Sequence, residues 1–334
     1  MPIYYKGINL EHNHVRQSVG IFDVSHMGQL IVEGKESLKF LQNITTNDVS
    51  KLIIGKVQYS CITNEEGGIL DDLLLYKLSE KKYMLVVNAS NIDKIIQWMF
   101  KQNKYGLHIE NITHKNGLIA LQGPKALNLL QKITDYDLSR ISYYSFDYIN
   151  LLDKKNILVS ATGYTGAGGF EIYAEKSVIQ KIWTALFDVK NSDLLPIGLG
   201  ARDTLRMEMG YCLYGNEINE QTTPIEAGLS WIVDFNKEFI GSKVLKNKKI
   251  KKKIIGFELE EKGIPRKGYD LVNEKNEKIG YVSSGTMSPY LKKSIGIGYV
   301  YMSASFDIFF ILIRNRKIKV NLVKFPFIKK QLKL

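Results

Sequence analysis

The pattern of this 334-residue sequence changes after a lysine-rich stretch at positions 243–253. Beyond it, short apolar runs alternate with turns, and no window has the spacing of a helix. Strands are expected there at 254–259, 278–284, 296–300, 306–313 and 318–323. Several short strands without a helix predict a separate, small β-barrel domain, which we place at 246–334, after a first region at 1–245.

The first region mixes strand-like and helix-like windows. Strands are expected at 29–32, 58–63, 69–78, 83–87 and 118–121, with more between 143 and 174. Helices are expected at 92–99, 126–130 and 178–187, in a short stretch around Leu38 and Leu41, and from about Ala201. Short connections between these elements favour antiparallel sheets with helices packed on one face, and therefore an α+β fold.

Composition limits the class of protein. With 45% hydrophobic and 24% charged residues, the chain can bury a sizeable core. The longest apolar run, 306–313, is far shorter than the roughly 20 residues that cross a bilayer. The start has no basic stretch followed by an apolar one, and two cysteines are too few for a disulfide framework. We therefore expect a cytoplasmic protein without a membrane segment.

The net charge of +12 does not by itself indicate a nucleic-acid binder. Only seven of the 46 basic side chains are arginine, the residue that reads base edges best. The lysines are spread along the chain, apart from the run at 243–253. We interpret that run as a solvated linker, or alternatively as a docking site for an acidic partner protein.

Common cofactor and metal motifs are absent. Gly198 and Gly200 lack the third glycine of a dinucleotide-binding loop, because position 203 is aspartate. His12 and His14 have no neighbouring cysteine or glutamate cluster, so no metal site is expected. Both cysteines are interpreted as small buried hydrophobic residues.

The segment 69–76 places two acids in an apolar strand. Because side chains alternate along a strand, Asp71 and Asp72 should point to opposite faces and not act as an acid–base pair. Leu70, Leu74 and Tyr76 should share the face of Asp72. A carboxylate among leucines needs donors, which either turn amides of the 64–68 loop or a ligand rich in N–H groups could supply.

Two further stretches carry charges in unusual settings. The glycine-rich segment 162–169 precedes Glu171, an acid in an apolar strand, and its glycines would let the backbone approach a flat ligand. On the following helix, Arg202 and Arg206 should share a face. They could belong to an internal salt-bridge cluster, and Asp203 could be no more than a first-turn charge that favours the helix dipole.

Eight short segments follow one another in the order 22–28 (FDVSHMG), 46–49 (TNDV), 67–73 (GGILDDL), 86–91 (VVNASN), 162–166 (TGYTG), 201–203 (ARD), 212–217 (CLYGNE) and 286–289 (TMSP). Together they resemble one known family, the glycine-cleavage T-proteins or aminomethyltransferases, and the order and spacing match from about Pro2 to Phe327.

The resemblance implies a three-domain cloverleaf around a central folate channel, with two intertwined subdomains in the first region, the second at about 50–135. It implies transfer of a one-carbon unit from the aminomethyl-lipoyl arm of H-protein to tetrahydrofolate as co-substrate, without a metal. Asp72 matches the acid next to the reacting folate nitrogens and is the expected catalytic residue. The folate-binding positions it implies are Met27, Asp72, Val86, Asn88, Glu171 and Arg202.

The sequence also departs from the family. Relatives usually carry further residues before the position matching Pro2, so the first domain is expected to be thinner. A folate-contacting tyrosine near the C-terminus is replaced within 329–332. A related folate-binding protein linked to RNA modification is the main rival, but its Lys-Gly-Cys-Tyr-x-Gly motif is absent from 209–215. Fused flavin-dependent dehydrogenases need a longer chain.

Overall fold

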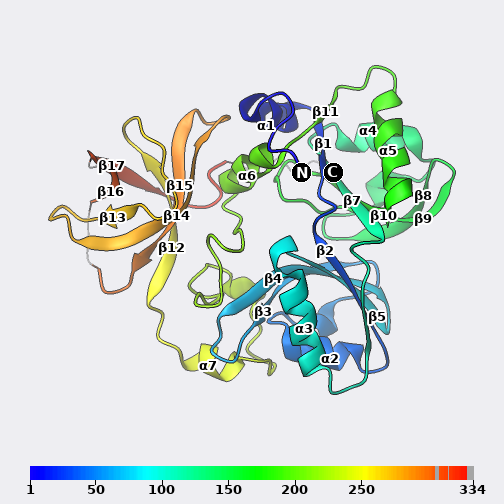
Figure 1. The fold of residues 1–334 in the computed structure, drawn as a ribbon, viewed down its shortest axis with the longest axis horizontal. Helices are drawn as coiled ribbons and strands as arrows, with labels where there is room; N and C mark the ends of the chain where they lie inside the picture. The colour runs from blue at the N-terminus through cyan, green and yellow to red at the C-terminus, as the bar shows by residue number, and fades with distance from the viewer. Residues whose placement is uncertain (305–307, 315, 329–334) are drawn as a thin grey trace.

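A computed structural model describes residues 1–304, 308–314 and 316–328 as three lobes, each built on a sheet (Figure 1). The first sheet has the strand order β11-β1-β7-β10-β9-β8, and the second has the order β3-β4-β5-β2-β6. The third lobe is a closed barrel in the order β12-β15-β14-β13-β16-β17. This architecture confirms the predicted α+β class with a C-terminal barrel.

The first sheet joins strands from both ends of the first region. Its strands are β1 (Val19–Asp23), β7 (Asn116–Gln122), β8 (Phe146–Leu151), β9 (Lys154–Ser160), β10 (Gly169–Glu175) and β11 (Leu194–Pro196). Neighbours are antiparallel except β1 and β11, which pair in parallel. The purely antiparallel pairing expected from short connections is therefore wrong at this edge, because β11 returns to β1 from far along the chain.

Between β1 and β7 the chain builds the whole second sheet. Its strands are β2 (Gly28–Glu33), β3 (Val57–Thr63), β4 (Ile69–Ser79), β5 (Lys82–Val87) and β6 (His108–Asn111), all paired antiparallel. Helices α2 (Ser37–Ile44) and α3 (Ile92–Gln102) cover one face of this sheet, whereas α4 (Ala126–Leu130) and α5 (Lys176–Asp188) cover the first sheet (Figure 1).

The barrel follows the predicted strands closely. It contains β12 (Lys252–Leu259), β13 (Asp270–Val272), β14 (Lys278–Ser288), β15 (Lys293–Tyr301), β16 (Phe309–Ile313) and β17 (Arg316–Val323). The three-residue strand β13 had no signal in the sequence because it is too short to show alternation. Part of the strand expected at 306–313, residues 306 and 307, lies outside the described residues.

The lysine-rich stretch is not the simple linker that we expected. Its first half lies in helix α7 (Ser242–Asn247), where Leu245 is buried, and its end opens β12. The ammonium group of Lys252 bonds the hydroxyls of Thr222 and Tyr281, at 2.9 Å each. Lys249 and Lys251 between these elements are exposed.

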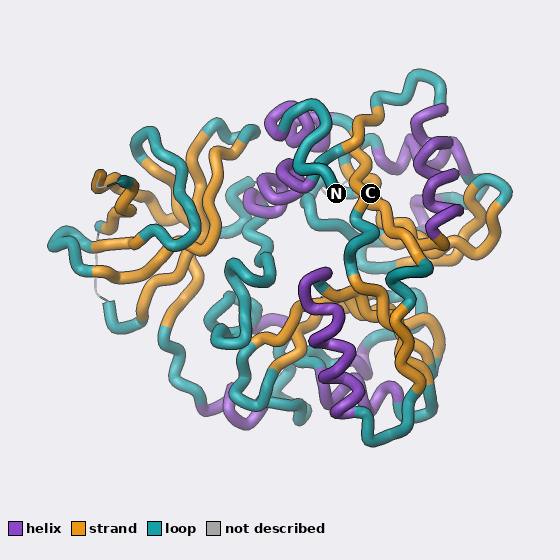
Figure 2. The backbone as a smooth tube through the Cα atoms, in the orientation of Figure 1, coloured by secondary structure: helices purple, strands orange, loops and turns teal. Residues whose placement is uncertain are grey.

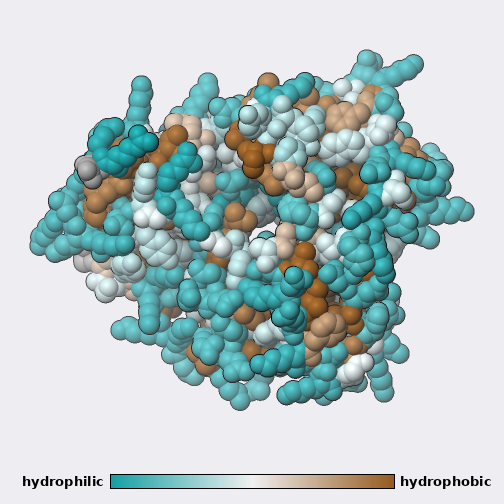
Figure 3. All heavy atoms as spheres, viewed as in Figure 1, coloured by the Kyte–Doolittle hydropathy of each residue, from teal (hydrophilic) through white to brown (hydrophobic). Residues whose placement is uncertain are grey.

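The hydrophobic core of the first region consists of separate clusters, each packed against a different face of the two sheets. One cluster lies between the first sheet and its helices, and another lies between the second sheet and α2 and α3. A third cluster joins the inner faces of both sheets to α1 (Ile8–Gln17) and α6 (Leu199–Glu208). Figure 2 shows helices lying beside the strands of the two sheets, and the space-filling view is hollowed at the centre, where the lobes meet (Figure 3).

Candidate active site

Strand β4 carries the two predicted acids on opposite faces. Leu74 and Tyr76, on the face of Asp72, belong to the central cluster, whereas Leu73 packs under α2 and α3. The alternation is therefore confirmed from Asp72 to Tyr76. Leu70 packs with Leu73 instead, close to a register shift of the β3–β4 pair.

Although they face opposite ways, the two carboxylates share one amide. Asn88 Nδ2 donates to Asp71 Oδ1 and to Asp72 Oδ1, at 2.7 Å each. Asp71 also accepts the backbone N–H of Asn88 at 3.0 Å and Asn91 Nδ2 at 2.6 Å. Within the 64–68 turn, the backbone N–H of Gly68 donates to Asn64 Oδ1 rather than to either aspartate. The amides after β5, rather than the turn, therefore satisfy the fully buried Asp71.

Asp72 is half-buried on the face of β4 that carries Leu74 and Tyr76. Tyr59 donates its hydroxyl to Asp72 Oδ2 at 2.9 Å, and Asn88 holds the other oxygen. Burial raises the pKa of Asp72, while these two donors oppose the rise. Burial and the charge of Asp72 raise the pKa of Asp71 to about 7. Because Asp72 nevertheless keeps some solvent-accessible surface, it can contact a ligand.

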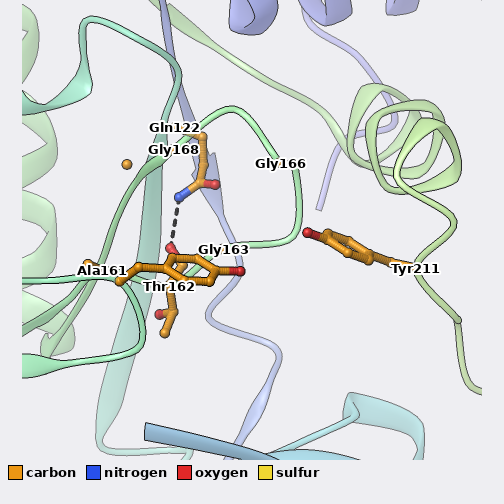
Figure 4. Close-up of a pocket in the computed structure, with 9 residues that line it drawn as sticks. Gln122, Ala161, Thr162, Gly163, Gly166, Gly168 and Tyr211 are labelled. Carbon is orange, nitrogen blue, oxygen red and sulfur yellow. Dashed lines mark hydrogen bonds between the residues drawn. The ribbon is translucent and has the colours of Figure 1, made fainter. Parts of the chain in front are cut away.

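The glycine-rich loop predicted to approach a ligand lines a small pocket next to Glu171. The pocket is lined by residues of the loop and by Gln122, Tyr143 and Tyr211, and Gln122 Nε2 donates to the carbonyl of Thr162 at 3.1 Å (Figure 4). A Cβ at Gly163 would lie 2.1 Å from Gln122 Oε1, so a side chain there would force the Gln122 amide to move. The glycine thus lets Gln122 pack against the loop.

Glu171 projects from β10 and is 6% exposed. Thr162 Oγ1 donates to its Oε2 at 2.5 Å. Burial raises the pKa of Glu171, opposed by the Thr162 bond and by the positive charge of Arg202. The acid is therefore held beside a cation with which it forms no direct bond.

The two arginines of α6 have different surroundings. Arg206 is fully buried and bonds Asp203 Oδ1 and Glu217 Oε2, at 2.8 Å each, as the salt-bridge alternative expected. Arg202 forms no ion pair within the described part of the chain, and its guanidinium lies 4.6 Å from the ring centre of Tyr164. Arg202 is therefore free to bind an anionic or electron-rich ligand group.

The predicted site residues come from both sheets and from α6. Val86 and the half-buried Met27 pack in the central cluster that also holds Tyr76. The charges of Asp72 and Arg202 both act on the pKa of Tyr164, and the charge of Glu171 acts on the pKa of Arg202. Residues far apart in the sequence are thus close enough for their charges to interact. The predicted contact within 329–332 lies outside the described residues.

Sequence reasoning missed Tyr59 and Tyr164. Tyr59 lies on β3, which pairs with β4, and its hydroxyl reaches Asp72. Tyr164 donates its hydroxyl to the carbonyl of Cys212 and stacks on Tyr211 at 5.7 Å between ring centres. Tyr59 could have been found from the predicted hairpin register, whereas the contacts of Tyr164 depend on tertiary structure alone.

No group of three or more histidine, cysteine, aspartate or glutamate side chains with metal-binding geometry occurs among the described residues. Within the same residues, no helix is both long and apolar enough to cross a membrane. Cys61 and Cys212 are free and buried, as predicted.

Two sheets and helix α6 bring together buried or half-buried acids, several tyrosines and Arg202, a convergence of polar groups that is common in small-molecule sites. Residues 1–237 match the family "GCVT N-terminal domain", and residues 252–329 match "Glycine cleavage T-protein C-terminal barrel domain". The chain belongs to the glycine cleavage T-protein family and is a transferase of the aminomethyltransferase class.

Curated relatives support this assignment over nearly the full length. The chain is 48% identical to an aminomethyltransferase of Flavobacterium psychrophilum, over 99% of this chain and 93% of the relative. It is 51% identical to one of Bacteroides thetaiotaomicron, over 98% and 93%. The crystal structure of glycine cleavage system aminomethyltransferase T from Bartonella henselae superposes with a TM-score of 0.91 at 32% identity, covering 99% of this chain and 92% of that one.

Proposed function

We propose that this protein transfers the one-carbon unit of the aminomethyl group on the lipoyl arm of H-protein to tetrahydrofolate. The carbon–sulfur and carbon–nitrogen bonds of that group break, and the carbon joins two folate nitrogens. Ammonia, 5,10-methylenetetrahydrofolate and dihydrolipoyl H-protein result. The two free cysteines are consistent with a reducing cytoplasm as the place of the reaction.

The observation that carries this proposal is the pair of buried or half-buried carboxylates, Asp72 and Glu171, each held by neighbouring donors. A reduced pterin presents adjacent N–H groups on a flat aminopyrimidine edge, and carboxylates in a low-dielectric wall accept such donors strongly. Asp72 and Glu171 supply two carboxylates, and each is buried enough for its pKa to rise. Met27 and Val86 supply apolar surface for the ring. The residues present therefore fit a folate.

We assign Asp72 the catalytic role. Tyr59 and Asn88 each donate to one of its oxygens, which fixes the plane of the carboxylate. In this position Asp72 orients the folate amine that attacks the one-carbon unit and assists its loss of a proton. Exclusion of water by the surrounding lobes keeps the electrophilic carbon from hydrolysis.

The remaining predicted residues bind the folate. Asn88, directly after β5, donates to both aspartates and so holds Asp72 in place beside the ligand. Arg202 presents its guanidinium over Tyr164, next to Glu171. Its positive charge offsets the two carboxylates, so that the ligand enters a site that is not strongly anionic.

The direct test is ammonia release from aminomethylated H-protein by the purified protein, with and without tetrahydrofolate. We expect release that depends on folate and yields methylenetetrahydrofolate in equal amount. Measurable folate binding without folate-dependent ammonia release would contradict the proposed transfer and would favour a folate-binding relative without transferase activity.

A further inference from the structure

Four hydroxyl groups form a closed hydrogen-bonded set behind Glu171, which we call the hydroxyl ring. Thr162 Oγ1 lies 2.5 Å from Glu171 Oε2 and 2.7 Å from Ser160 Oγ. Tyr76 Oη lies 3.2 Å from Ser160 Oγ, 3.3 Å from Thr162 Oγ1 and 2.8 Å from Tyr173 Oη. Tyr173 closes the ring by donating to Glu171 Oε2 at 3.4 Å.

The side chains of the hydroxyl ring are almost completely buried. Ser160 and Tyr76 have no exposed surface, and Thr162 and Tyr173 are 3% and 4% exposed. Hydrogen bonds in such surroundings are stronger than in water, and losing one leaves a polar group without a partner. The orientation of each hydroxyl is therefore coupled to that of its neighbours, and ultimately to the carboxylate of Glu171.

Both bonds from the ring reach the same oxygen of Glu171. Oε2 accepts Thr162 and Tyr173, whereas Oε1 accepts no hydrogen bond from any residue in the described ranges. A carboxylate has acceptor capacity on both oxygens. The ring thus occupies one side of the group and leaves the other available to a ligand.

Tyr76 links the two sheets, because among the ring residues it alone comes from the second sheet. Tyr76 and Asp72 lie on one face of β4, four residues apart, whereas Glu171 and Tyr173 lie on β10. Four residues of strand span about 13 Å. The ring therefore ties the strand of one ligand-facing carboxylate to the strand of the other, across the junction of the two sheets.

We propose that Thr162 and Tyr76 are positioning residues for folate binding, which hold Glu171 Oε2 so that Oε1 accepts the N–H donors of the pterin. This inference rests on the proposed function. Donation from Thr162 stabilises the negative form of Glu171, together with the charge of Arg202, while burial disfavours it. Loss of that hydroxyl raises the pKa of Glu171. As the pH falls, Glu171 is then protonated at a higher pH than in the wild type and no longer acts as a charged acceptor.

The test compares tetrahydrofolate affinity across pH in four variants of the full chain. Thr162→Val removes the hydroxyl with little change in shape, and Thr162→Ser restores it. We expect Thr162→Val to weaken binding at neutral pH about tenfold or more, since it loses a bond to a charged group. As the pH is lowered, the folate affinity of Thr162→Val should also begin to decline at a higher pH than that of the wild type. Thr162→Ser should return the neutral-pH affinity and the pH of this decline close to their wild-type values.

Tyr76→Phe provides an independent measurement, with a matched control in the next strand. Tyr83 on β5 is also fully buried, but its hydroxyl has no partner among the described residues, so Tyr83→Phe should leave folate affinity unchanged. Tyr76→Phe should weaken binding and shift the pH profile in the same direction as Thr162→Val. Thermal unfolding of each variant shows whether it remains folded.

The outcomes separate the two proposals. A wild-type protein that binds no tetrahydrofolate at any pH would overturn the proposed function and this inference with it. Wild-type binding with an unchanged pH profile in Thr162→Val and Tyr76→Phe would overturn the positioning role alone. Equal loss in Thr162→Ser and Thr162→Val would do the same, because the shape of the side chain rather than its hydroxyl would then matter.

Discussion

Glu208 at the end of α6 is a buried anion whose removal should be costly. Its Oε2 accepts Arg16 Nε at 3.0 Å and Nη2 at 2.8 Å, and its Oε1 lies 3.0 Å from His12 Nε2 and accepts the hydroxyl of Ser288. All four side chains are buried. This contact joins α1, α6 and strand β14 of the barrel, and so holds the helix that carries Arg202.

The substitution Glu208→Gln keeps the shape but removes the charge. Both bonds from Arg16 reach one oxygen, which a glutamine amide could still supply, but the buried guanidinium would lose its counter-charge. Breaking a buried ion pair typically costs about 3–5 kcal/mol. We expect urea unfolding at neutral pH, followed by tryptophan fluorescence, to give a decrease of this size in the free energy of unfolding.

A surface pair provides the control. Glu33 and Lys82 form an ion pair of 2.9 Å, but their side chains are 46% and 40% exposed. Glu33→Gln should therefore cost no more than about 1 kcal/mol. Equal effects of Glu208→Gln and Glu33→Gln would refute the argument that the buried contact holds α1, α6 and the barrel together.

The loss of stability caused by Glu208→Gln should also depend on pH in a defined direction. Burial acts to raise the pKa of Glu208, but the bond and charge of His12 and the charge of Arg16 outweigh it, and the pKa lies below 4.5. A carboxyl with a lowered pKa in the folded state stabilises the protein above pH 4.5, and this contribution is lost as the pH falls through the lowered value. The difference between wild type and Glu208→Gln should therefore shrink in acid.

Three further predictions follow from individual contacts. Burial raises the pKa of the Cys61 and Cys212 thiols, so both should resist a thiol reagent until the protein unfolds; rapid labelling of native protein would contradict this. Gly68→Ala would place a Cβ 1.7 Å from the carbonyl oxygen of Glu220, so the melting temperature should fall, by the equivalent of about 1–3 kcal/mol. Reversing Lys249 and Lys251, between α7 and β12, and the exposed Lys253 of β12 to glutamate should raise the Michaelis constant for H-protein while folate affinity stays unchanged, and an unchanged constant would exclude docking there.

Much of the secondary structure could be predicted because it is local. The helix at 126–130 matches α4, and the hairpin of β3 and β4 was indicated by alternation and by the turn residues between the strands. The parallel contact of β1 with β11 could not be predicted, since it joins segments more than 170 residues apart. Periodicity tells which face of a strand is buried, but not which strand lies beside it.

The candidate site shows the same limit. Alternation correctly placed Asp71 and Asp72 on opposite faces, but it did not show that Asn88 bridges them. Helix spacing placed Arg202 and Arg206 on one face, and only the tertiary structure gave Arg206 its carboxylates and left Arg202 without one. The sequence pattern assigned Lys252 to a solvated linker, whereas in the structure its ammonium group lies over the ring of Tyr299 in the barrel.

The most direct test of the central claim is folate-dependent ammonia release from aminomethylated H-protein by Asp72→Asn beside the wild type. Loss of an acid–base group typically lowers a rate about 10²–10⁴-fold. We predict a decrease in this range, with folate binding still measurable because Glu171 and Arg202 remain. Asp147→Asn, on the exposed side of β8, should be neutral. An Asp72→Asn variant that releases ammonia at the wild-type rate would contradict the account.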